Sequence, residues 1–231
     1  MYLILPSNSP ALSFPQNKSS DFTIPLPITL PTKNWKVGLA QVQLPITFYN
    51  VENEEKVVIE NTAGDIEVLN LAEGIYENPQ DLIKMLERCC KNKLSWRWNV
   101  GLEVELLGDI NKVRFSKKMS RLLGLPTSLE SSRASSKMEE YDPWINHRVL
   151  LIHCSLAEPV QFNNSQLQIL RAIVPSHFDF GHTCCSSFYP VDFLKVQGDA
   201  HTTVSIKITD IDQAPIRFRS GNVVVQLVLE G

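Results

Sequence analysis

The sequence predicts an all-β protein, a single jelly-roll sandwich of two antiparallel sheets with one inserted helix and a second, short helix. Three observations support this class. Short apolar segments with alternating polar residues recur along the chain. Turn-forming residues separate them at the spacing typical of sandwiches and barrels. Helical periodicity is confined to two segments. Two packed sheets of this kind form the jelly rolls that are common in viral shells.

The bulk composition fits one large β domain. The chain has 231 residues, of which 43% are hydrophobic and 20% charged, so it can form a core without disulfides or metals. Its net charge of −3 argues against nucleic acid wrapping around the whole domain. Five cysteines include two adjacent pairs, which suit no common disulfide framework, so we expect free thiols in a reducing compartment. We find neither a signal peptide nor an apolar span of about 20 residues.

The first part of the chain is rich in proline. Six of the 14 prolines lie in residues 1–31, and a proline cannot donate a ladder hydrogen bond. We therefore expect residues 1–31 to form an arm and edge segment, and residues 32–231 to form the jelly-roll domain. The first long strand is predicted at 35–44. Its apolar residues change face midway, which predicts a β-bulge near Ala40-Gln41.

The next segments predict a hairpin and the main helix. Residues 57–60 and 65–70 alternate on either side of a turn containing Gly64, as in a hairpin. Asn78 is a good N-cap ahead of Pro79, and apolar residues at helical spacing extend the helix over about 78–91.

The remaining elements are mostly strands. Residues 102–106 and 112–115 predict a second hairpin around Gly108-Asp109. A short helix is expected near 117–124, because Gly124 and Pro126 would end it. Five serines mark 128–136 as a surface loop. Further strands are expected at 149–156, 167–173, 189–194, 203–209 and 223–229.

Sequence signatures of catalysis and metal binding are weak. No glycine-rich phosphate loop or nucleophile elbow occurs in the sequence. A zinc site could be assembled from His182, Cys184 and Cys185 only with help from His177, His153 or Cys154, and this spacing is unlike that of paired zinc ligands. Cys154 could be paired with His201 as a thiol nucleophile, but its alternating apolar neighbours indicate a buried structural thiol. We expect no enzyme activity, no cofactor and no metal.

One cluster of basic residues is a candidate contact for an acidic partner or DNA, because basic residues interleaved with aromatic ones can bind nucleic acid. Trp96 and Trp98 lie within or beside it, and Glu87 is the acidic residue that opposes it. The alternative is the solvated face of a helix and its connector. The basic residues are Lys84, Arg88, Lys91, Lys93 and Arg97.

Motifs along most of the chain resemble a capsid protein of Polinton (Maverick) elements and the related adintoviruses. In the first half they are Leu5-Pro6-Ser7-Asn8-Ser9, the strand 35–44 with Pro45, Tyr49-Asn50-Val51, Gly74-Ile75-Tyr76 before the helix, and 115–126. In the second half they are 151–159, 170–175, 189–191, 206–210 and 221–227. The chain departs from the family pattern at Lys36, where an acidic residue is usual. It departs again at Ile211-Asp212-Gln213, which lacks a turn glycine, and at its last residues.

The resemblance implies a penton-type minor capsid protein with a single jelly roll. Such a subunit would form homopentamers at the five-fold vertices, beside a double jelly-roll major capsid protein. It would be part of the virion and would assemble inside the host cell. The family role brings no catalytic residue. We further expect residues 1–31 to reach onto an adjacent capsid subunit.

The sequence is also compatible with three other functions. A cellular β-sandwich binding module would have the same strand pattern but would be a monomer. A thiol hydrolase would depend on Cys154, Cys184 or Cys185. An integrated viral gene reused by its host would keep the fold and change the role.

Overall fold

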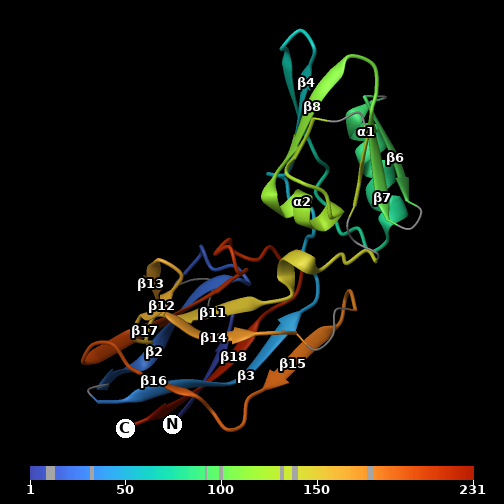
Figure 1. Cartoon of the computed structure of the whole chain (residues 1–231). Coiled ribbons are helices and arrows are strands. Elements are labelled where there is room, and N and C mark those ends of the chain that lie inside the picture. Colours follow the sequence, from blue (N-terminus) through green and yellow to red (C-terminus); the bar gives the residue numbers. More distant parts are fainter. Residues whose placement is uncertain are drawn as a thin grey trace. The chain divides into compact units, whose positions relative to one another are not determined.

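The computed structural model describes residues 1–8, 14–31, 34–91, 93–98, 101–130, 133–136, 140–175 and 179–231. It divides the chain into two compact units (Figure 1). The sandwich unit combines Met1–Phe48 with His147–Gly231, and the inserted unit is the continuous segment Tyr49–Asn146. The expected domain at 32–231 therefore contains the whole inserted unit and most of the sandwich unit.

The sandwich unit consists of two antiparallel sheets. The first sheet has the strand order β1 (Tyr2–Pro6), β18 (Val224–Glu230), β3 (Lys36–Pro45) and β15 (Thr183–Ser187), and β16 (Phe193–Lys195) also pairs with β3. The second sheet has the order β14 (Ile169–Ile173), β11 (Leu150–Cys154), β17 (Ala200–Thr209) and β2 (Asp21–Pro31). A small hairpin joins β12 (Val160–Phe162) to β13 (Ser165–Leu167).

Strict alternation supplies the core of this unit. On β17 the buried apolar residues are Val204, Ile206 and Ile208, and on β18 they are Val225, Leu227 and Leu229. These two strands belong to different sheets, so each sheet turns one apolar face inward and leaves the other outside. The all-β sandwich predicted from the sequence is confirmed.

The irregularity in the middle of β3 follows from the sequence. Gln226 pairs with Gln41 and Leu227 with Leu39, so Ala40 is the extra residue of a bulge. The bulge predicted at this point is confirmed, and it lets both halves of β3 turn their apolar residues inward.

Residues 1–31 contribute strands to both sheets. β1 and β2 each lie at the edge of a sheet, where proline is tolerated. Leu5 is 2% exposed and Phe22 is 1% exposed. A chain lacking residues 1–31 would lose these core side chains, so we do not expect such a truncation to fold.

The inserted unit has its own sheets, helices and core. One sheet has the order β5 (Ile66–Asn70), β4 (Lys56–Asn61), β8 (Ile110–Phe115) and β9 (Ser128–Leu129), and the other has β10 (Arg133–Ser135), β7 (Leu102–Leu106) and β6 (Leu94–Trp98). The helices are α1 (Pro79–Cys90) and α2 (Lys117–Leu123), and a 3₁₀ turn spans Ile145–His147. β9 and β10 lie in the described part of the serine-rich segment 128–136.

Both helices begin and end as their sequences indicate. The side-chain oxygen of Asn78 accepts a hydrogen bond from the Asp81 N–H at 2.9 Å and caps α1. Ser116 caps α2 in the same way through the Met119 N–H at 3.1 Å. Gly124 ends α2 with φ of 65°, a left-handed conformation that glycine adopts at little cost. The two predicted helices are confirmed.

The predicted hairpin of 102–106 with 112–115 is wrong. β7 pairs with β6 and β10, whereas β8 pairs with β4 and β9. Gly108, with φ of 67°, turns the chain out of one sheet and into the other. Both strands alternate in the same way, so their patterns did not identify their partners.

The predicted strand at 189–194 is also mostly wrong. The strand β16 begins only at Phe193, and the neighbouring strand is β15 at Thr183–Ser187. The β15 segment consists of threonine, two cysteines and two serines. Its residues are small and mostly polar, so they gave no apolar alternation to detect.

Candidate assembly surface

The outer face of the first sheet has few charged residues. Its side chains point away from the core and form cross-strand rows defined by the strand register. One row is Ile4, Gln226, Gln41 and Ser187, and the next is Pro6, Val224, Gln43 and Cys185. Tyr2 and Val228 begin a third row. Charged side chains on these strands are confined to one end of the face, at Lys36, Glu230 and Lys195.

This composition is typical of a surface that another protein covers. Interface centres are depleted in charged residues, whereas ordinary surfaces are not. Tyr2 and Ile4 are both 66% exposed, and they lie next to each other on this face at the sheet edge. The Gln41 amide donates to the sulfur of Cys185 and the hydroxyl of Ser187, each at 3.2 Å. The uncharged side chains of Gln41, Cys185 and Ser187 therefore hydrogen-bond to one another.

The connection between β15 and β16 carries a further exposed aromatic side chain, that of Tyr189. Arg171 of β14 places its guanidinium 4.3 Å from the centre of the Phe188 ring, and its Nη1 lies 2.7 Å from Oδ2 of Asp192. Both contacts hold this loop in place. Between them Tyr189 is 98% exposed. A tyrosine presented from a fixed loop can contribute strongly to binding when a partner buries it.

The predicted basic residues all lie in the inserted unit, but several already have acidic neighbours. Lys84 Nζ lies 3.2 Å from Oδ1 of Asp81, and Lys93 forms an ion pair with Glu67. Arg97 lies opposite Glu103 in the β6–β7 register. Arg88 and Lys91 are exposed at the C-terminal end of α1. The basic character of the cluster is therefore greatest at that end.

A hollow with a volume of about 690 Å³ lies on the outer face of the second sheet. Asp21, Lys207 and His153 form a cross-strand row within it. The Nε2 atom of His153 lies 2.9 Å from Oγ1 of Thr209. Partial burial, assisted by the charge of Lys207, lowers the pKa of His153. The imidazole therefore favours its neutral form.

The cysteine considered as a nucleophile faces the core. Cys154 is 1% exposed, and burial raises the pKa of its thiol to about 11. His201 Nε2 instead lies 2.7 Å from the carbonyl oxygen of Gln197. Cys90 is buried in the inserted unit, and burial raises its pKa to about 12. A thiolate nucleophile is disfavoured at both buried cysteines.

The described residues include neither a metal-binding cluster nor a membrane-spanning helix. Within the described residues, no group of three or more His, Cys, Asp or Glu side chains is arranged to hold a metal ion. His177, one of the candidate zinc ligands, lies outside those residues. No helix in the described ranges is long and apolar enough to span a bilayer.

Sequence analysis did not identify the assembly surface. A signal was present in Tyr2-Leu3-Ile4-Leu5, where both faces of one strand are apolar. A strand at a wet surface normally alternates. Tyr189 had no such signal, because its exposure depends on contacts made by Arg171, which is distant in the sequence.

Comparison with known proteins supports the fold. No family model matches the sequence, and no curated protein matches it. Among solved structures, the crystal structure of the selenomethionine-labelled mavirus penton protein matches with a TM-score of 0.51 and 10% sequence identity. The match covers 99% of this chain and 98% of that one. The two proteins therefore share a fold along nearly their whole length.

Proposed function

We propose that this protein is a penton-type minor capsid subunit that self-associates into a closed ring of five. The observation that carries the proposal is the weakly charged outer face of the first sheet, with Tyr2 and Ile4 exposed at its edge. The fold shared with the mavirus penton protein supports the same role. The order of motifs supports an origin in Polinton-like elements or adintoviruses.

This role requires association but no chemistry. A ring contact is heterologous, so each subunit must present two different matching surfaces. Stable obligate interfaces bury about 2,000–5,000 Å² in total. The ring would occupy the five-fold vertices of a virion shell beside a double jelly-roll major capsid protein, after assembly inside the host cell. A host-reused gene would keep the fold and change the role, and a cellular binding module would be a monomer.

Native mass spectrometry of the purified chain tests the proposal. We expect five copies in the main species at micromolar protein concentration, and a smaller mass when Tyr2 and Ile4 are both changed to serine. The double change leaves Leu5 and the rest of the core untouched. A monomer for the unchanged chain would favour the binding module, and a two-fold dimer would contradict a ring.

We also propose that the exposed end of the basic cluster, Arg88 and Lys91, contacts an acidic partner such as packaged DNA. Changing both residues to glutamate should weaken binding of duplex DNA and lower the slope of log affinity against log salt by about 2, because each phosphate contact contributes about 0.9. The control changes Lys18 and Lys56 to glutamate, which alters net charge equally at positions outside the cluster. Equal losses in both variants would show a net-charge effect and would contradict a local site.

A further inference from the structure

Within the described residues, one edge of the first sheet is an apolar strand, β1, with backbone groups that no other strand pairs. The N-terminal ammonium group of Met1 donates to the Leu229 carbonyl at 2.7 Å, and the Leu229 N–H donates to the Met1 carbonyl at 2.8 Å. In antiparallel pairs, residues that exchange bonds alternate with residues whose polar groups point away. The N–H and C=O groups of Tyr2 and Ile4 therefore point out of the sheet. Edge strands are usually protected by charges, prolines or bulges. Every residue of β1 is described and none is charged, and its proline stands at its last position.

The opposite edge offers the matching groups. β15 pairs with β3 on one side, and the Phe188 N–H donates to the Ala40 carbonyl at 2.8 Å. By the same alternation, Ser186 and Cys184 bond to β3, and Thr183, Cys185 and Ser187 direct their backbone groups outward. These three side chains are also exposed.

The two edges agree in direction, length and face. Each neighbouring pair along β1, β18, β3 and β15 is antiparallel. Strand direction alternates along this path of four strands, so β1 and β15 run in opposite directions. In a second copy with the same orientation, β1 would therefore lie antiparallel to β15 of the first copy. Both strands have five residues. The residues with outward backbone groups place their side chains on the same outer face in both strands.

We propose that β1 of one copy adds to the free edge of β15 of the next copy, so that the first sheets join into one continuous sheet around the ring. This inference rests on the proposed self-association. Opposing residues would be Tyr2 with Ser187, Ile4 with Cys185, and Pro6 with Thr183. The proline, which cannot donate, lies at the end of the pair. Because the joined edges differ, the contact is heterologous, as a closed ring requires.

The native thiol of Cys185 allows a direct test. Cys185 is exposed and free. Directly opposed antiparallel residues that exchange hydrogen bonds have Cα atoms about 5.5 Å apart, within the range that a disulfide spans. In an Ile4→Cys variant, mild oxidation should link neighbouring copies into a ladder of up to five chains on a non-reducing gel.

Two controls make the cross-link specific. Ile4→Cys combined with Cys185→Ser should give no ladder. Ile66→Cys, with Cys185 retained, introduces a thiol at a residue that is 60% exposed on another edge strand, and it should also give none. A ladder in either control would overturn the assigned pairing.

A proline variant tests the same contact without a thiol. Ile4→Pro removes an N–H that makes no bond to β18, so the fold should remain while the ring is lost at a concentration where the unchanged chain is fully assembled. Circular dichroism checks the fold and native mass spectrometry checks the ring. Two results would overturn strand addition but leave the proposed ring in place. In the first, the Ile4→Pro variant still forms rings. In the second, the Ile4→Cys variant forms rings that oxidation does not cross-link through Cys185. An unchanged chain that stays monomeric would overturn the proposed function as well.

Discussion

Changing Phe48 to alanine should lower the free energy of unfolding by about 3–5 kcal/mol, the usual cost of emptying a large buried aromatic site. Phe48 is 0% exposed. Its ring stacks on His147 with centroids 5.4 Å apart and meets the edge of Phe218 at 5.3 Å. Phe48 and His147 are the residues at which the chain leaves and re-enters the sandwich unit. The lost ring would therefore weaken the sandwich where its two chain segments meet.

Urea unfolding followed by circular dichroism measures this change. All variants must be compared at one protomer concentration, because association adds to apparent stability. Phe48→Leu is the matched control, since it keeps most of the apolar volume and should cost clearly less than the alanine variant. A loss below about 1 kcal/mol for Phe48→Ala would mean that the site collapses around the smaller residue, contrary to a packed core.

Local patterns predicted most of the secondary structure. Alternation located β17 and β18, and the phase change in the first long strand located its bulge at Ala40. The cap at Asn78 located α1. Each of these features depends on residues within one element or its immediate turn, so the sequence contains the whole signal.

Pairing and surface chemistry depend on residues that are far apart. The partners of β7 and β8 could not be assigned, because both strands present similar apolar faces. The basic cluster is recognisable within its own segment of the sequence. The acidic partner of Lys93 is Glu67, which lies in β5, so the sequence of the cluster does not show this ion pair. The weakly charged outer face requires four strands from both ends of the chain. A single sequence shows each of these strands but not their order.

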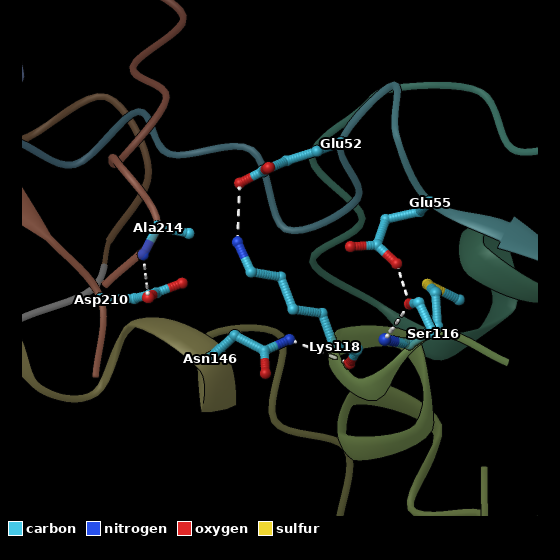
Figure 2. Close-up of polar contacts among 8 residues, drawn as sticks. Glu52, Glu55, Ser116, Lys118, Asn146, Asp210 and Ala214 are labelled. Carbon is cyan, nitrogen blue, oxygen red and sulfur yellow. Dashed lines mark hydrogen bonds and ion pairs between the residues drawn. The ribbon is translucent and has the colours of Figure 1, made fainter. Parts of the chain in front are cut away.

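Changing Lys118 to methionine should destabilise the inserted unit by about 3 kcal/mol, because it removes the positive charge that lies beside the Glu52 carboxylate in a poorly hydrated place. Lys118 Nζ lies 3.3 Å from Oε1 of Glu52, and their side chains are only 18% and 11% exposed (Figure 2). The Lys118 carbonyl also accepts from Asn146 Nδ2 at 3.0 Å (Figure 2). That bond uses the backbone and survives the substitution, so the measured loss reports on the ion pair.

A double-mutant cycle separates the two possible origins of this loss. If the lost attraction between Lys118 and Glu52 is the cause, Glu52→Leu combined with Lys118→Met should recover most of the stability, because apolar pairs of similar volume often replace buried ion pairs at little cost. Lys84→Met is the matched control. Its pair with Asp81 is 62% and 53% exposed, where solvent screens the charges, so little change is expected. A double variant as unstable as Lys118→Met alone would show that the lysine chain contributes by packing rather than by pairing Glu52.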